Sequence, residues 1–194
     1  MKKFVKDGRK KRKMNRILYL ILKKQKERQY IKYIEKHQEN IKNAFEEMVM
    51  CPDMSFIPWE FYHVDLYEQI LKHDNSKYEL KEFDAYRKNF YPVNEEEKEL
   101  NKDDFEEAWK HHWESNRHHW ECREYDNCED GKLSRQQTLD CLENVLDWMA
   151  MGYQFNDRPY QFYEKNKDKI KLPQAEKDFI EKIIYEGIDK KYIK

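Results

Sequence analysis

Glycine and proline are scarce in this chain, with four Gly and five Pro among 194 residues. An all-β fold needs frequent turns, which these two residues commonly make, so their scarcity argues against such a fold. The cysteines are also few, and none has the Cys-x-x-Cys spacing of a metal or redox motif (Cys51, Cys122, Cys128 and Cys141). In a cytosolic chain we expect them to be reduced thiols.

The chain also lacks a long apolar run. Beyond its basic start, the apolar run is the six residues Ile17-Leu18-Tyr19-Leu20-Ile21-Leu22. A signal peptide needs an apolar core of about 7–15 residues, and a membrane-spanning helix needs about 20. We therefore predict a cytoplasmic protein with no secretory signal and no membrane span.

Charge is unevenly distributed along the sequence. The whole chain carries a net charge of −1, yet residues 1–16 hold nine Lys or Arg and one acid, Asp7. We predict a basic, flexible N-terminal arm over residues 1–16 and a single all-helical domain over residues 17–194. The arm could contact nucleic acid or an anionic surface, and its simplest role is that of a solubilising tail. Nucleic-acid binding is not favoured, because basic and aromatic residues are not interleaved as in RNA-binding segments.

What the chain does have is aromatic residues, with 14 Tyr, 10 Phe and 5 Trp. Large rings can build a core where aliphatic residues are few, and disordered chains lack them. Apolar residues recur at helical spacing along most of the sequence. Together these features predict an all-α bundle of about six or seven helices.

The expected helix boundaries follow from breakers and caps. Ser76-x-x-Glu79 and Ser134-x-x-Gln137 are capping boxes that predict helix starts, and Gly152 predicts a helix end. Residues 93–103 and 125–132 are expected to be connections. The predicted helices cover about 14–49, 58–74, 76–91, 103–123, 134–152, 160–166 and 173–186. In the third of them Leu80, Phe83 and Phe90 are expected to form the buried side.

Histidines and carboxylates form the most informative pattern. His37 lies in the middle of an apolar helix stripe, and His73-Asp74 follows at the expected end of the next helix. Burying several imidazoles is costly unless their nitrogens are satisfied, and a metal cluster would satisfy them. A single histidine such as His37 would by itself be read as a hydrogen-bonded core residue. The pattern continues with His111-His112, His118-His119 and Asp147, which lies at the edge of an apolar helix face.

The spacing of His112 and His119 limits the kind of site. On one straight helix they would be about 10.5 Å apart along the axis. That distance suits two metals side by side, or a helix broken near Ser115-Asn116, better than a single tetrahedral zinc.

The order His37, His73-Asp74-Asn75-Ser76-Lys77, His112, His118-His119, Asp147 resembles the HD superfamily of metal-dependent phosphohydrolases. HDNSK matches the HDxxK form seen in cyclic-dinucleotide phosphodiesterases, but the accompanying Gly-Tyr-Pro segment is absent. The segments HDNSKYELKEF, AWKHHWESNRHHW and LDWMAMGYQF are also similar to those of a family of uncharacterised small bacterial and phage proteins.

The resemblance implies an HD-domain-like helical bundle with one or two divalent transition-metal ions, namely Mn, Fe, Co, Ni or Zn, with Mg as a further candidate. Asp74 would bridge two ions, and Lys77 would hold the substrate phosphate. The implied substrate is a nucleotide or related phosphate ester, hydrolysed by a metal-activated water that Asp74 orients or deprotonates. The implied ligands are His37, His73, Asp74 and Asp147 for the first ion, and His112 with His118, His119 or both for the second.

Two other functions are compatible with the same residues. Some HD-fold proteins use a di-iron centre to activate O₂, so an oxygenase is one alternative. A non-catalytic module with a structural metal site, or with no remaining metal, is the other. Iron content with oxygen consumption would identify the first, whereas an Asp74 substitution that lowers only stability would identify the second.

Overall fold

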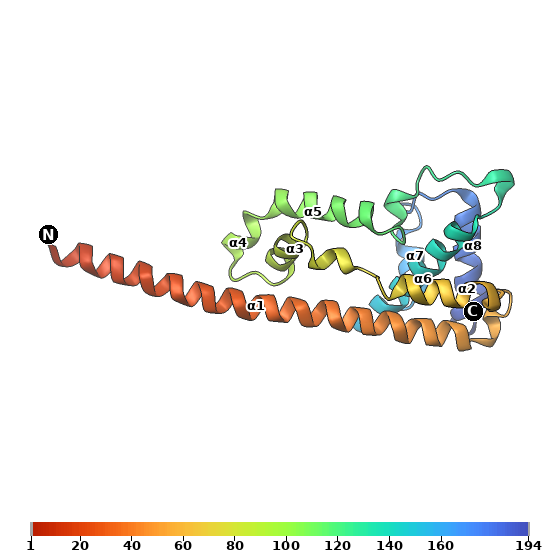
Figure 1. Cartoon of the computed structure of the whole chain (residues 1–194), viewed down its shortest axis with the longest axis horizontal. Helices are drawn as coiled ribbons and strands as arrows, with labels where there is room; N and C mark the ends of the chain where they lie inside the picture. The colour runs from red at the N-terminus through yellow and green to blue at the C-terminus, as the bar shows by residue number, and fades with distance from the viewer. Residues whose placement is uncertain (1, 194) are drawn as a thin grey trace. The chain divides into compact units, whose positions relative to one another are not determined.

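The computed structural model describes residues 2–193, with side chains from Arg16 onward. The described residues form eight α-helices and no strand (Figure 1), so the predicted all-α class is confirmed. Short 3-10 turns and one π-helix, Ile183–Ile188, connect or extend these helices. The helices are α1 (Lys2–Met50), α2 (Trp59–Ile70), α3 (Phe83–Phe90), α4 (Glu95–Glu99), α5 (Lys102–Ser115), α6 (Arg135–Phe155), α7 (Pro159–Asn166) and α8 (Gln174–Lys182).

Contacts divide the chain into two compact units. The first unit contains the residues up to Ile34 and Lys77–His111, and the second contains Glu35–Ser76 and the residues from His112 onward. Helix α1 begins at Lys2, earlier than expected, and contributes residues to both units. The predicted flexible arm over 1–16 and single domain over 17–194 stay predictions.

The first unit has an aromatic core. Tyr30, Ile34 and Tyr86 are almost completely buried, and the Tyr30 ring lies 5.2 Å from that of Phe83. Helix α4 forms within the acidic segment that we expected to be a connection. The Asn94 side chain caps it by accepting the Glu97 N–H, and its acidic first turn complements the helix dipole.

The second unit has a mostly aliphatic core around α6. As the sequence predicted, Ser134 and Gln137 form a capping box at the start of α6, and its apolar stripe is buried. Ile180, Ile183 and Ile184 pack into the same cluster from α8 and the π-helix. The buried stripe of α6 comprises Leu139, Leu142, Leu146 and Met149.

The predicted helix over 76–91 is wrong in its first half. Asn75–Tyr78 is a 3-10 turn and α3 begins only at Phe83. Leu80 is 100% exposed and Phe90 is 57% exposed, so neither belongs to a buried side. The Ser76 hydroxyl does not cap a helix: it lies 3.2 Å from His112 Nδ1 and accepts a hydrogen bond from Asn116. These contacts with a distant segment replace the local capping bond.

Two further helix ends differ from expectation. Helix α5 ends at Ser115, where the Asn116 side chain donates to the His112 carbonyl oxygen at 2.7 Å. The broken helix is therefore correct, and the straight helix reaching residue 123 is wrong. Helix α6 continues through Gly152 to Phe155, and a Cβ at Gly152 would lie only 2.5 Å from the carbonyl oxygen of Asp157. Gly152 thus permits a close backbone approach instead of ending the helix.

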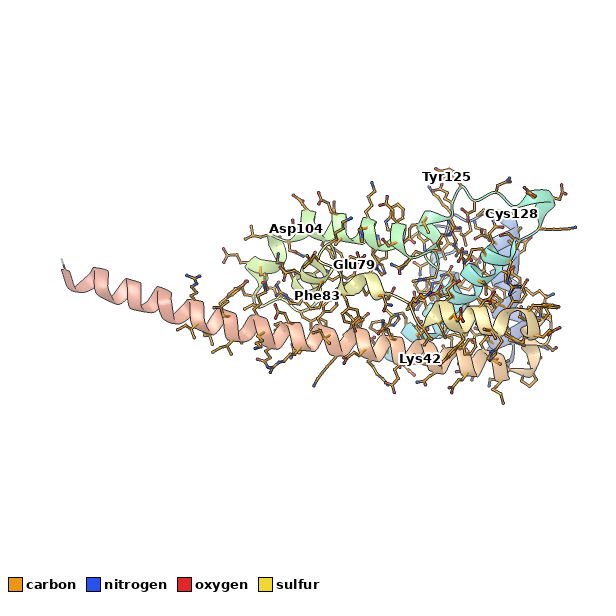
Figure 2. All side chains as sticks on the ribbon, in the orientation of Figure 1. Lys42, Glu79, Phe83, Asp104, Tyr125 and Cys128 are labelled. Carbon is orange, nitrogen blue, oxygen red and sulfur yellow. The ribbon has the colours of Figure 1, made fainter. Side chains whose placement is uncertain are left out.

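The remaining connections agree with the sequence. The segment 125–132 is a loop that contains Tyr125 and Cys128, with one short 3-10 turn (Figure 2). All four cysteines are free thiols. Among the described residues no helix has both the length and the low charge needed to cross a lipid bilayer.

Candidate metal centre

Five elements of the second unit bring histidines and carboxylates together. His37 comes from α1, His73 and Asp74 from the turn after α2, and His112 from the last turn of α5. His118 follows in the turn after α5, and Asp147 comes from α6. The residues of this cluster that are at most 2% exposed are His37, His73, Asp74, His112 and His118.

Asp74 has an unusual backbone conformation at the centre of this cluster. Its φ is +57°, in the left-handed region. A residue other than glycine adopts this conformation at a cost of about 1–3 kcal/mol, although Asp tolerates it better than most. The surrounding structure must therefore fix Asp74 here, and such backbone strain is concentrated at functional sites.

The two carboxylate oxygens of Asp74 face different pairs of imidazoles. Oδ2 lies 3.4 Å from His37 Nε2 and 3.6 Å from His73 Nε2. Oδ1 lies 3.3 Å from His112 Nε2 and 3.6 Å from His118 Nε2. The carboxylate thus stands between two nitrogen pairs, and each oxygen belongs to one of them.

Asp147 joins the first imidazole pair. Its Oδ1 lies 3.1 Å from His37 Nε2 and 3.8 Å from His73 Nε2, while the two Nε2 atoms are 3.1 Å apart. Burial favours the neutral acid, but hydrogen bonds and charge from His37 and His73 outweigh it and hold the pKa of Asp147 well below its usual range. Four potential ligand atoms from three segments therefore converge here, and the Asp147 side chain is 17% exposed.

His118 and His119 differ in their relation to Asp74. His118 Nε2 approaches Asp74 Oδ1, and among the described residues it is buried with no hydrogen-bond partner. His119 packs its ring 4.3 Å from that of His118, and its Nδ1 lies 3.8 Å from Glu121 Oε2. Burial and the neighbouring His118 and His112 lower the pKa of His119 well below 6.5. His119 would therefore be a neutral imidazole.

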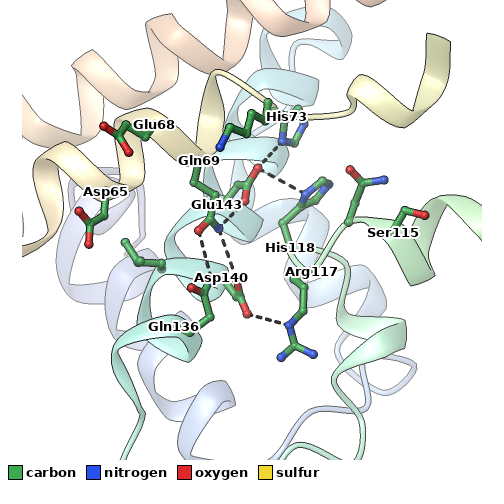
Figure 3. Close-up of a pocket in the computed structure, with 13 residues that line it drawn as sticks. Asp65, Glu68, Gln69, His73, Ser115, Arg117, His118, Gln136, Asp140 and Glu143 are labelled. Atoms are coloured by element: carbon green, nitrogen blue, oxygen red, sulfur yellow. Dashed lines mark hydrogen bonds and ion pairs between the residues drawn. The ribbon is translucent and has the colours of Figure 1, made fainter. Parts of the chain in front are cut away.

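Glu143 is a site residue that sequence reasoning missed. Its Oε1 accepts from His73 Nδ1 at 2.8 Å and lies 3.5 Å from His118 Nδ1 (Figure 3). A carboxylate on Nδ1 fixes the imidazole tautomer and leaves Nε2 free to bind a metal. Glu143 precedes Asp147 by one helical turn of α6, and this i,i+4 spacing was the available signal.

The histidines and carboxylates of this cluster shift one another's pKa. Burial would lower the pKa of His73, but the charge of Asp74 and hydrogen bonds to Asp147 and Glu143 raise it from 6.5 to about 10. Burial likewise favours neutral Glu143, yet His118 and His73 hold its pKa well below its usual range. The cluster therefore needs positive charge, which either protons or a metal cation can supply.

A cavity of about 410 Å³ opens on the Glu143 side of His73 and His118. Its lining contains four carboxylates and two side-chain cations, beside the imidazoles of His73 and His118 (Asp65, Glu68, Asp140, Glu143, Lys72 and Arg117). Arg117 is bound to Asp140 and to Asp126, so it is already neutralised. Gln69 links Glu143 to Asp140 across the cavity wall (Figure 3).

Arg123 anchors the segment that carries His118 and His119. Its side chain is completely buried, donating to Glu176 at 2.8 Å and to Asn144 at 2.7 Å. A third hydrogen bond reaches the His118 carbonyl oxygen at 3.4 Å. Sequence reasoning did not predict this role, because it placed Arg123 on a straight continuation of α5.

The donor atoms suit a divalent transition metal. In three groups of residues, every residue offers one ligand atom, and the ligand atoms of a group all lie within 4.8 Å of one another. The groups are His37/His73/Asp74, His73/His118/Glu143 and Asp74/His118/His119. Imidazole nitrogen with carboxylate oxygen is the ligand set of iron, manganese and zinc sites.

Lys77, the expected phosphate contact, belongs to the first unit. It lies in the 3-10 turn Asn75–Tyr78, with its Nζ 6.0 Å from the centre of the Tyr86 ring.

Fold and site together define an all-α protein with a buried His/Asp/Glu cluster that could hold metal ions. The chain belongs to DUF5662, a family of unknown function, whose model matches residues 26–186. The matched range includes every candidate ligand. Neither the curated proteins nor the solved structures gave a match to the chain.

Proposed function

We propose that the protein is a metal-dependent phosphohydrolase acting on a nucleotide or a related phosphate ester. The observation that carries this proposal is the position of Asp74, whose two oxygens each face a separate pair of imidazole Nε2 atoms. A carboxylate placed in this way can bridge two cations. The arrangement supports the resemblance to the HD superfamily that the residue order suggests.

Each ion would have its own ligand set. His37, His73, Asp147 and Asp74 Oδ2 would hold the first ion. His112, His118 and Asp74 Oδ1 would hold the second, with His119 beside them. In this assignment Asp74 would supply one oxygen to each ion, so the main role of Asp74 would be to hold the two ions together.

Bound divalent ions would lower the pKa of a coordinated water and neutralise charge that develops on phosphoryl oxygens. The protein's own residues prepare for this chemistry. Glu143 keeps a proton on Nδ1 of His73 and orients the ring. Asp147 is the most exposed side chain of the first ligand set, at 17%, so water and substrate would approach from its side. The expected phosphate contact of Lys77 rests on the HDxxK resemblance.

The first test is metal analysis of freshly purified full-length protein, followed by a panel of nucleotide phosphates with the same metal restored. We expect about one or two transition-metal ions per chain and turnover of at least one phosphate ester. Protein that takes up no metal would contradict the proposal. Iron with oxygen consumption but no phosphate release would favour the oxygenase alternative.

The second test substitutes Asp74. Asp74→Asn removes the charge but tolerates a positive φ, and Asp74→Ala removes the ligand entirely. We expect both variants to lose turnover while the helical circular dichroism is retained. The matched control is Asp130→Asn, because Asp130 also has a positive φ of 51° but lies outside the cluster. If the Asp74 variants lose only stability and no phosphate ester is hydrolysed by the unaltered protein, the site is structural.

A further inference from the structure

The first unit exposes four aliphatic side chains on one turn of α1. Ile17, Leu18, Leu20 and Ile21 are between 54% and 59% exposed. At 100° per residue they fall within an arc of about 160° on the helix surface. We call these four residues the apolar arc.

Tyr19 marks the opposite side of the helix. Its hydroxyl donates to Glu97 Oε1 at 2.9 Å, which joins this side of α1 to α4 of the same unit. The centre of the apolar arc is about 180° from Tyr19 around the helix. The arc therefore points away from the part of the unit that α1 contacts. Single exposed aliphatic residues are common, but a contiguous group of this kind usually marks an interaction surface.

Positive charge lies on both sides of the apolar arc along the chain. Residues 1–16, directly before it, carry nine Lys or Arg and one acid. Lys24 and Arg28, directly after it, are exposed, and the helical repeat places them on the same side of α1 as the arc. An apolar group flanked by cations is typical of a helix that lies in the interface of an anionic bilayer.

We propose that the N-terminal part of α1 binds an anionic lipid surface, with the apolar arc entering the boundary between head groups and acyl chains. Lys24 and Arg28 contact the lipid head groups, and the net positive charge of residues 1–16 attracts the chain to the anionic surface. Neither signal is sufficient alone, because stable anchoring needs apolar burial as well as charge attraction. The apolar run is too short to span the bilayer, so the helix lies along the surface.

Two other occupants fit these residues less well. Nucleic acid would attract the cations but would leave the four aliphatic side chains in water. A second copy of the chain could cover the apolar arc, but it would bring two highly basic segments together, and like charges repel. An anionic lipid surface satisfies both the apolar and the basic residues.

The experiment is vesicle flotation of the full-length protein. Vesicles of phosphatidylcholine alone are compared with vesicles that contain about 30% phosphatidylserine. We expect binding to the phosphatidylserine vesicles only, weakening as salt is added because the charges are screened. The variant Ile17→Ser/Ile21→Ser should lower the partition coefficient by about tenfold or more.

The matched control is Leu80→Ser/Leu100→Ser, which removes two aliphatic side chains of the first unit that are 100% and 78% exposed. This control should bind as well as the unaltered protein. Equal binding by the Ile17→Ser/Ile21→Ser variant, or equal binding to both vesicle types, would overturn the proposal. A dimer in vesicle-free solution that the Ile17→Ser/Ile21→Ser variant dissociates and the control does not would also overturn it. Binding to single-stranded RNA without binding to vesicles would do the same.

Discussion

The two units of the protein bury charge in opposite ways. In the first unit the Arg87 side chain is completely buried and makes two hydrogen bonds to Glu97, at 2.8 and 2.9 Å, and one to Asp84. In the second unit Asp74 is buried among imidazoles whose Nε2 atoms face one another, as in the 3.1 Å pair His37 and His73.

The difference indicates which cluster is structural. The Arg87 cluster is a fixed cation between two carboxylates, so it is neutralised without any ligand. The Asp74 cluster consists of groups that could all be ligands for a cation, and either protons or a bound cation would balance its charge. The Arg87 network is therefore balanced by the protein alone, whereas the Asp74 cluster would be balanced by added protons or by a bound cation.

The largest expected effect is on the first unit. Arg87→Ala leaves the half-buried Glu97 without its cation, and because removing one partner of a fully buried ion pair typically costs about 3–5 kcal/mol, we expect a cost near the lower end of that range. We expect a lower midpoint in urea unfolding, while the metal content per folded chain is unchanged. A large loss of metal in this variant would contradict the independence of the two clusters.

Metal removal should act on the second unit alone. A ligand at about 100–1000 times its Kd stabilises the folded state by about 3–4 kcal/mol, so a chelator should remove that stabilisation. Hydrogen exchange followed by mass spectrometry can locate the effect. We expect faster exchange in α6 and in the turn after α2, with little change in α3. Equal acceleration of hydrogen exchange in both units would contradict the expectation that metal stabilises the second unit alone.

Local sequence signals predicted α6 of the second unit well, because the interactions that define it join residues close in sequence. Ser134 and Gln137, three positions apart, cap its start, and the spacing of its apolar residues predicts its buried stripe. The same reasoning failed at Ser76, where bonds to His112 and Asn116 replaced the cap. Such bonds join segments far apart in sequence, so no local pattern can indicate them.

The candidate histidine ligands could be predicted from the sequence because they form clusters along it. Histidine is rare enough that its clusters are visible in a sequence, and the broken helix near Asn116 was foreseen as one way to bring His112 and the later histidines together. Glu143 was not foreseen, because acidic residues are common in this chain, with 39 Asp and Glu. Its i,i+4 spacing from Asp147 was a weak signal among so many acids, and the contact of Glu143 with each imidazole Nδ1 depends on the folded arrangement.

Glu143→Gln tests that second contact and should have an intermediate effect. The amide keeps the shape but no longer carries the negative charge that orients His73 and His118. Loss of such an outer partner usually lowers metal affinity about 10–100-fold. Competition with a fluorescent chelator measures the change. The control is Asp140→Asn, because Asp140 shares the partner Gln69 with Glu143 but contacts Arg117 instead of an imidazole. Equal losses in both variants would assign the effect to the general charge of the cavity wall.

Acidification should have the smallest effect, and it should again distinguish the first unit from the second. Burial raises the pKa of Glu97, but hydrogen bonds from Arg87, the Val93 N–H and Tyr19 outweigh this and hold the pKa below 4.5. A carboxyl whose folded pKa is lowered stabilises the fold above its unfolded pKa, and this contribution is lost as the pH falls through the folded value. We therefore expect the hydrogen-exchange protection factors of α3 and α4, which are corrected for the intrinsic exchange rate at each pH, to fall only below a pH of about 4.5. In Glu97→Gln this pH dependence should shrink, and an unchanged dependence in that variant would show that Glu97 is not its source.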